Sequence, residues 1–150
     1  MADPDIMKAQ QQLICRGYLP DGADDGILGP QTVHAIIAYQ TDRSTGHVWA
    51  FTFPLAIDGI IGRHTRFRLE PRQIQRGDTG DHVKLCQEIL TWLADHTGHP
   101  NYDPKGIDSD FGPNTEAAVK AFQKDHKDHE GNPLKVDGIV GVRTWCALRS

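Results

Sequence analysis

The chain has 150 residues, 38% of them hydrophobic, a formal net charge of -4 and a mean hydropathy of -0.49. These values suit one ordinary domain or two small ones, and they argue against a nucleic-acid partner, which requires a basic patch. No apolar run approaches the roughly 20 residues that cross a bilayer, and the first residues lack the basic and apolar regions of a Sec signal peptide. We therefore expect no membrane partner and synthesis in the cytoplasm without such a signal.

Three helices are expected in the first half of the chain. The first covers residues 4–17, where apolar residues recur at helical spacing. The second begins at Pro30, because the missing N–H of proline costs nothing in a first helical turn. The third is short and covers residues 62–69. A short linker that contains a proline follows at residues 69–73.

The second half repeats this order of elements. A helix is expected over residues 80–95, with Asp81 as its N-cap. The next helix begins at Pro113, and a short last helix covers residues 141–148. The sequence therefore predicts an all-α fold.

The two halves also align on each other. Residues 25–40 match residues 108–123 without a gap, and residues 58–69 match residues 137–148. Such self-similarity is typical of repeated structural units. We predict two tandem three-helix modules, which cover residues 1–70 and 74–150.

A short motif occurs four times, at the start of the second and of the third helix in each module. It consists of an aspartate, a glycine four residues later and a threonine three residues further on. The aspartate side chain can accept from backbone N–H groups ahead of it, and a glycine next to it tolerates positive φ. The apolar residues that follow are expected to plug the loop into the core, the second glycine to act as N-cap, and the threonine to bond back to the capping backbone. We assign a structural role in turns and caps to Asp25, Gly29, Thr32, Asp58, Gly62, Thr65, Asp108, Gly112, Thr115, Asp137, Gly141 and Thr144.

The first module carries an insert at residues 41–57, in which Trp49, Phe51 and Phe53 alternate with other residues. This spacing suits an extended segment with one aromatic face. The aromatic face can pack over the module, form a dimer contact or stack on sugar rings, and packing is the favoured interpretation.

The three cysteines are an odd number in dissimilar settings, unlike the even, dense spacing of a disulfide framework. Cys86 and Cys146 fall within apolar helical patterns and are expected to be small buried hydrophobic residues. The sequence therefore predicts free thiols and folding in a reducing compartment.

The motif and its surroundings resemble the bacterial peptidoglycan-binding domain 1 family, as found in endolysins and wall hydrolases. The family pattern opens with Val-x-x-Leu-Gln-x-x-Leu, continues with Asp-Gly-x-Phe/Leu-Gly-Pro-x-Thr-x-x-Ala-Val/Ile-x-x-Phe/Tyr-Gln and ends with Asp-Gly-x-x-Gly-x-x-Thr-x-x-x-Leu. Residues 108–148 match it closely, and residues 6–69 match almost as well. One departure is Asp108-Ser-Asp, where the family has Asp-Gly. The resemblance implies a small three-helix module that binds the bacterial cell wall.

No catalytic residue, metal ligand or cofactor is predicted. The pairs His96/His99 and His126/His129 lack a third ligand of the kind a zinc site needs, so we expect solvated surface histidines; a zinc site built across both pairs is the alternative. No Gly-x-Ser-x-Gly motif is present. The chain is therefore expected not to be an enzyme, although it can be part or partner of a cell-wall hydrolase.

By resemblance, the binding groove lies beside the second helix of each module and the loop before it. Helix starts offer unpaired backbone N–H groups to the carboxylates of a stem peptide, and aromatic rings offer stacking. The candidate ligand-binding residues are Asp110, Asn114, Lys120 and Trp145 in the second module, and Gln31 and Phe67 in the first.

The leading functional hypothesis is non-catalytic binding of peptidoglycan, either a muropeptide or its stem peptide. The chain would target or anchor a cell-wall-active enzyme or a secreted effector. It would then act at the cell wall, in the periplasm or outside the cell, after signal-independent export or lysis. An interaction adaptor that keeps the fold without wall binding is the first alternative, and a small wall hydrolase is the second.

Overall fold

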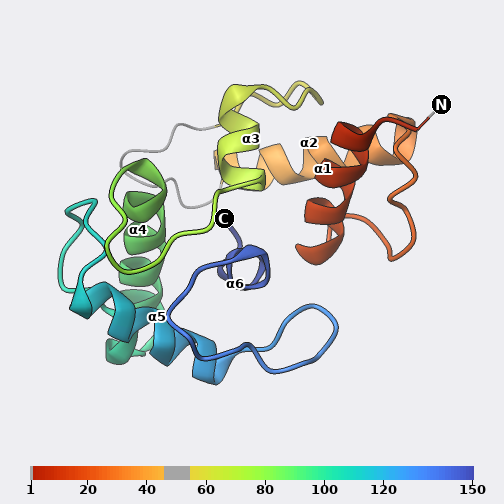
Figure 1. Cartoon of the computed structure of the whole chain (residues 1–150). Coiled ribbons are helices and arrows are strands. Elements are labelled where there is room, and N and C mark those ends of the chain that lie inside the picture. The colour runs from red at the N-terminus through yellow and green to blue at the C-terminus, as the bar shows by residue number, and fades with distance from the viewer. Residues whose placement is uncertain (1, 46–54) are drawn as a thin grey trace. The chain divides into compact units, whose positions relative to one another are not determined.

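A computed structural model describes residues 2–45 and 55–150 (Figure 1). Within these residues the regular structure is helical, apart from isolated β-bridges, so the expectation of an all-α fold is confirmed. Six α-helices and one 3-10 helix follow each other along the chain: α1 (Pro4–Cys15), α2 (Pro30–Thr45), α3 (Arg63–Leu69), α4 (Asp81–Thr97), η1 (Pro100–Tyr102), α5 (Pro113–Asp125) and α6 (Val142–Leu148). None of the helices in the described part is long and apolar enough to cross a membrane.

The chain divides into two compact units, Met1–Glu70 and Pro71–Ser150. In the first unit, α1 packs against α2 and α3. Tyr39 of α2 is fully buried, and the ring of Tyr18 meets its edge at a centroid distance of 5.5 Å and an interplanar angle of 88°. The core of this unit consists of Ala9, Leu13, Leu19, Ala35, Ile36, Tyr39, Leu55 and Leu69.

In the second unit, α4 packs against α5, α6 and η1. Tyr102 of η1 lies edge-on to Phe122 at a centroid distance of 5.7 Å, and its hydroxyl donates to the Asp125 carboxylate at 2.6 Å. Burial of this apolar set supplies most of the stability of such a small unit. The buried residues include Val83, Leu85, Cys86, Ile89, Leu90, Phe111, Val119, Phe122, Val140 and Trp145.

The helix starts follow the expected chemistry with one correction. Gly62, Gly112 and Gly141 are the N-caps of α3, α5 and α6, as the motif predicted. The expectation for Asp81 is wrong: Gly80 is the N-cap of α4, with φ 113°, and Asp81 is the first helical residue. A backbone at that φ favours glycine, so the glycine takes the cap and the aspartate moves into the first turn, where its charge suits the helix dipole.

The expectation of three free thiols holds for one cysteine only. Cys86 is a buried free thiol, and burial raises its pKa to about 12. Cys15 and Cys146 are disulfide-bonded, so the prediction is wrong for both. An odd count of cysteines does not exclude disulfide bonds, and spacing along the chain does not reveal them. The aromatic residues Trp49, Phe51 and Phe53 of the expected insert lie outside the described residues.

Candidate binding site in the second unit

Each copy of the motif is held by one buried glutamine from the helix before it. Gln10 of α1, Gln40 of α2, Gln87 of α4 and Gln123 of α5 are at most 1% exposed. In every copy the amide nitrogen donates to the motif aspartate, to the carbonyl two residues later and to the motif threonine. In every copy the amide oxygen accepts backbone N–H groups at the turn. We call this arrangement the glutamine clamp.

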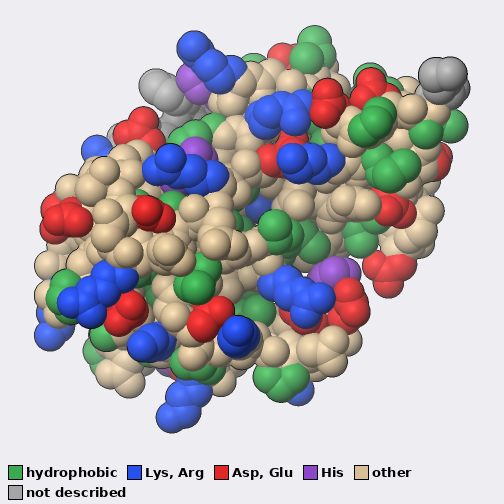
Figure 2. Space-filling view, viewed as in Figure 1, with side chains coloured by type: hydrophobic (Ala, Val, Ile, Leu, Met, Phe, Trp, Pro, Cys, Tyr) green, Lys and Arg blue, Asp and Glu red, His purple; other side chains and the backbone are tan. Residues whose placement is uncertain are grey.

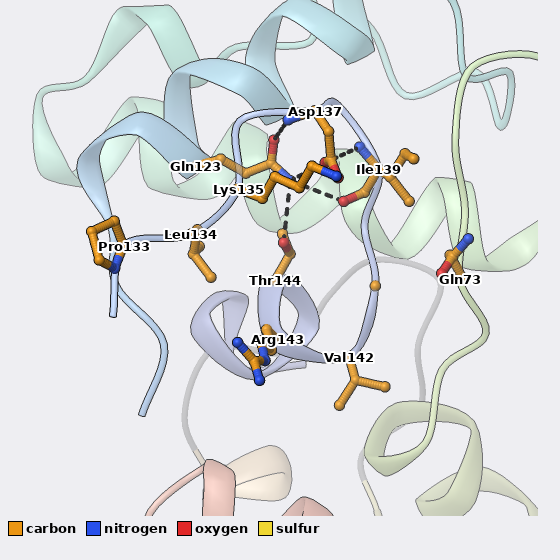
Figure 3. A pocket seen from close by; sticks show the side chains of 11 residues that line it. Gln73, Gln123, Pro133, Leu134, Lys135, Asp137, Ile139, Val142, Arg143 and Thr144 are labelled. Atoms are coloured by element: carbon orange, nitrogen blue, oxygen red, sulfur yellow. Dashed lines mark hydrogen bonds between the residues drawn. The ribbon is translucent and has the colours of Figure 1, made fainter. Parts of the chain in front are cut away.

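The fourth clamp shows the geometry in full (Figure 3). Nε2 of Gln123 lies 3.2 Å from Oδ1 of Asp137, 2.9 Å from the carbonyl oxygen of Ile139 and 3.2 Å from Oγ1 of Thr144. Its Oε1 accepts from the backbone N–H groups of Asp137 at 3.2 Å and Gly138 at 3.0 Å. One side chain thus satisfies most of the polar groups of a tight loop, groups whose burial without partners would be costly.

The aspartates play the part that the sequence predicted. In each copy Oδ1 accepts the backbone N–H two residues ahead, at 2.9–3.0 Å. The backbone N–H of Asp110 and the amide of Gln87 hold the pKa of Asp108 below its ordinary value, because both interactions favour the carboxylate. Ser109 takes φ 64°, close to the 75° of Gly138, so the departure from Asp-Gly keeps the same turn.

Two details of the motif differ from expectation. The threonine hydroxyls accept from the clamp glutamines, so the predicted bond back to the capping backbone is not their main interaction. Phe111 and Val140 plug into the core as expected. Ile27, Leu28 and Ile60 do not, because they are 54%, 52% and 64% exposed. Glutamine hydrogen bonds therefore hold the loops of the first unit without an equally deep apolar plug.

A pocket of about 370 Å³ opens beside the fourth motif (Figure 3). Ile74 pairs in antiparallel fashion with Val140, with N···O distances of 3.2 and 2.8 Å. This pairing brings the preceding residue, Gln73, to the edge of the pocket. Apolar and polar side chains share the walls, a composition typical of small-ligand sites. The lining residues are Gln73, Gln123, Pro133, Leu134, Lys135, Asp137, Ile139, Gly141, Val142, Arg143 and Thr144.

The carboxylate of Asp128, whose side chain is only 3% exposed, positions Arg143 at this pocket. Nη1 of Arg143 lies 3.2 Å from Oδ2 of Asp128, while the arginine side chain is 70% exposed. The other oxygen of Asp128 accepts the backbone N–H groups of Glu130 and Asn132, each at 2.9 Å. One nitrogen of the guanidinium is thus anchored, and its other donors remain accessible.

The described residues on the face drawn in Figure 2 form no large patch of a single charge. On the face drawn in Figure 2, Lys and Arg side chains are interspersed with Asp and Glu side chains. A mixed surface of this kind gives little long-range steering of a charged ligand. Lys135 and Arg143 are the cations among the residues that line the pocket.

The expected ligand-binding residues lie in several places. Asp110 and Asn114 are exposed at the start of α5, and Gln31 is exposed at the start of α2. Lys120 lies two turns further along α5 and pairs with Glu116 at 3.7 Å.

Two aromatic candidates are less accessible. Trp145 is 1% exposed, and its indole N–H donates to the carbonyl oxygen of Arg72 at 2.9 Å, so its ring belongs to the core. Phe67 is half-buried. None of the six candidates lines the pocket.

Sequence reasoning missed Lys135, Arg143 and the clamp role of Gln123. The glutamine had a signal, because it recurs at matching positions before all four motifs. The two cations had none, because Lys135 lies in a loop of variable length and Arg143 pairs with an aspartate 15 residues away.

The histidines do not assemble a metal site within the described residues, where no group of three or more His, Cys, Asp or Glu side chains could hold an ion. Three of them, His96, His99 and His126, lie against aromatic rings. His96 stacks on Trp92 at 4.7 Å, and His126 stacks on Phe122 at 3.9 Å.

Comparison with known proteins identifies the family. The family model described as "Putative peptidoglycan binding domain" matches residues 2–45 and 79–148. These stretches contain the first, third and fourth motifs, together with all four clamp glutamines. The resemblance expected from the motifs is therefore confirmed.

Two of the relatives are longer than this chain. It is 27% identical over its full length to a probable N-acetylmuramoyl-L-alanine amidase of Bacillus licheniformis, of which it covers 43%. Half of the chain (49%) is 39% identical to the type VI secretion system spike protein VgrG3 of Vibrio cholerae serotype O1, of which it covers 7%. The chain thus spans less than half the length of both relatives. The solved SleB N-terminal domain is 31% identical, with a TM-score of 0.40, over 51% of this chain and 88% of that one.

Proposed function

The chain belongs to the family of peptidoglycan-binding domains, and we propose that it binds bacterial peptidoglycan without cleaving it. In this role it targets or anchors a cell-wall-active enzyme or a secreted effector. Action at the cell wall, in the periplasm or outside the cell, is part of the proposal. The family match over both units supports the binding role.

The pocket beside the fourth motif is the observation that carries the proposal. It combines a volume of about 370 Å³ with apolar walls from Leu134, Ile139 and Val142 and polar groups from Lys135 and Arg143. Peptidoglycan presents alanyl methyl groups, amides and carboxylates close together on one peptide stem. A pocket with both kinds of wall suits such a ligand.

Each unit also has exposed residues that remain candidates for contacts with the polymer. Asp110, Asn114 and Lys120 are exposed along the start and middle of α5, and Gln31 holds the corresponding place on α2. Phe67 is partly accessible in the first unit. Binding through more than one weak site on a repetitive polymer would gain affinity by effective concentration.

The relatives suggest the context in which such binding is used. One is named as a probable amidase and the other as a secretion-system spike protein, and both are longer than this chain. A wall-binding segment fits either context, because it would hold an attached or associated activity close to its substrate.

Sedimentation with purified sacculi tests the proposal. The full chain should appear in the pellet at micromolar concentration, and sacculi digested to soluble fragments should leave it in the supernatant. The same samples test for a catalytic role. Binding without cleavage predicts that no new reducing ends or free amines appear over hours. A protein that stays in the supernatant at high micromolar concentration would refute wall binding.

An interaction adaptor is the second candidate, and the exposed apolar residues of the first unit favour it. Ile27, Leu28 and Ile60 are each more than half exposed, which is unusual for large aliphatic side chains placed next to structured turns. A stable dimer on size exclusion, together with no sacculus binding, would support the adaptor over the wall-binding role.

A further inference from the structure

We propose that the pocket of the second unit recognises a free carboxylate of the peptidoglycan stem peptide, which it holds between Lys135 and Arg143, and that the first unit lacks this site. The inference rests on the proposed wall-binding function and names the chemical group that the pocket selects. In the view of Figure 3, Lys135 lies along the upper rim of the pocket and Arg143 along the lower rim.

The balance of donors and acceptors points to an anionic ligand group. Protein groups already bond to both carboxylates nearby: Oδ1 of Asp137 accepts from Gln123 and from the N–H of Ile139, and Asp128 accepts two backbone N–H groups besides Arg143. Arg143 uses one nitrogen in that pair and keeps the rest of its fork for another acceptor.

Lys135 adds a second donor group, since it forms no ion pair with any residue that the structure describes. Lys135 and the remaining nitrogens of Arg143 therefore offer the pocket donors for a ligand. A carboxylate matches this pattern, and a planar guanidinium binds carboxylates with two parallel hydrogen bonds.

The anchoring of Arg143 makes the site preorganised. Asp128 is itself fixed by the turn at residues 128–132, where its backbone N–H donates to the carbonyl oxygen of Asn132 at 2.8 Å. The buried carboxylate thus holds the arginine in place before any ligand arrives, which lowers the entropy cost of binding.

The apolar wall restricts which carboxylate fits. Val142 is 57% exposed, and Pro133 is exposed beside it, although both are apolar. A carboxylate next to a methyl group, as on a terminal alanine of the stem, would contact these side chains while its oxygens reach the cations. A phosphate of an anionic wall polymer has no such apolar neighbour.

The first unit lacks this combination at the aligned positions. Where the second unit has Lys135 and Arg143, the first has Ala56 and His64. The segments before the second motif of each unit also differ in length, with 17 residues at 41–57 and 13 residues at 124–136. The two modules therefore differ in the residues that would bind a charged group of the ligand.

Calorimetry on the full chain tests the inference with a synthetic N-acetylmuramoyl tetrapeptide and its fully amidated counterpart. The free acid should bind about tenfold or more tightly than the amide, because a charge-assisted hydrogen bond is lost on amidation. Arg143→Gln should remove most of this preference, Lys135→Gln should reduce it about threefold, and both effects should weaken with salt. Lys124→Gln, which removes an exposed cation of α5 outside the pocket, should leave the preference unchanged.

Each outcome decides between the two proposals. Equal binding of acid and amide, with sacculus binding retained, overturns the carboxylate site and leaves wall binding standing. Loss of binding to sacculi and to both muropeptides overturns the proposed function itself. A soluble glycerol-phosphate oligomer can be added as a competitor. If it displaces the bound muropeptide as effectively as unlabelled free-acid muropeptide does, the selected group is not a carboxylate. Should Arg143→Gln unfold the turn at Asp128, which faster hydrogen exchange at the amides of Glu130 and Asn132 would reveal, Lys135→Gln decides, because Lys135 has no part in that turn.

Discussion

Replacing Gln123 by methionine tests whether the glutamine clamp holds the fourth motif. Methionine keeps nearly the same length and volume, so the change removes hydrogen bonds without opening a large cavity. The substitution leaves the backbone N–H groups of Asp137 and Gly138 and the hydroxyl of Thr144 without their partner.

The expected cost follows from how deeply each lost bond is buried. The bonds to the N–H of Gly138 and to Thr144 are buried, and each should cost about 1–2 kcal/mol when its partner disappears. The bonds to Asp137 and to the carbonyl of Ile139 are part-buried, so water replaces them at a smaller cost. We expect the free energy of unfolding of the second unit to fall by about 2–4 kcal/mol.

Urea unfolding and amide hydrogen exchange measure this effect. The amides of Asp137 and Gly138 should lose protection by about tenfold or more, because the loop opens more often. Gln75→Met, at an exposed position of the same unit, is the matched control and should change stability by less than about 0.5 kcal/mol.

A charged variant separates hydrogen bonding from packing. In Gln123→Glu a carboxylate faces Oδ1 of Asp137, which lies 3.2 Å from the native Nε2. Repulsion should make this variant less stable than Gln123→Met at neutral pH, and acid should relieve the difference, because protonation restores a donor. If Gln123→Met costs less than about 1 kcal/mol and the loop amides keep their protection, the clamp does not hold the motif.

Three further predictions concern the motif and the core. Gly138→Ala should cost about 1–3 kcal/mol in thermal unfolding, because φ is +75° and the new Cβ would lie 2.9 Å from Cγ of Glu116; Gly141→Ala, with φ -92°, should be nearly neutral, and equal costs would contradict the reasoning. The folded-state pKa of Asp108 lies below its ordinary value of 3.8, so its stabilisation is complete above that pH and is lost as the pH falls through the lower folded-state pKa. Asp108→Asn should accordingly flatten the acid limb of the stability curve, and an unchanged limb would argue against the lowered pKa. Cys86, with its pKa raised to about 12, should react with a thiol reagent only after denaturation, and rapid labelling of the native chain would refute its burial.

The sequence predicts the helices well because their signals are local. Pro30 and Pro113 are the first residues of α2 and α5, and Gly62 and Gly141 are the caps of α3 and α6. Each such boundary depends on backbone geometry within a few residues of the signal. Repetition of the motif adds a second line of evidence that no single copy supplies.

The candidate site was less predictable because its parts are distant in sequence. Arg143 gains its position from Asp128, and the pocket edge at Gln73 depends on the pairing of Ile74 with Val140. Trp145 illustrates the opposite error, since an aromatic residue on a short helix can face either a groove or the core. Only packing decides which, and here the ring is 1% exposed and the indole N–H donates to the backbone carbonyl of Arg72.

A comparison of the two units suggests how to tell the α5 surface from the pocket. In the first unit a Cβ on Gly59 would meet Val33 at 3.1 Å and Ile37 at 3.5 Å, whereas one on Gly138 in the second unit would meet Glu116 and Lys120. The aliphatic parts of Glu116 and Lys120 therefore cover the turn of the second unit, as Val33 and Ile37 cover the turn of the first.

The charges of Glu116 and Lys120 also pair with each other, because Nζ of Lys120 lies 3.7 Å from Oε1 of Glu116. Grafting the first unit's residues, as Glu116→Val with Lys120→Ile, should consequently preserve the fold. If the pocket is the binding site, the grafted chain should sediment with sacculi as the native chain does and keep its preference for the free acid. Loss of sedimentation, with an unchanged unfolding midpoint, would instead place the ligand on α5, at Glu116 or Lys120.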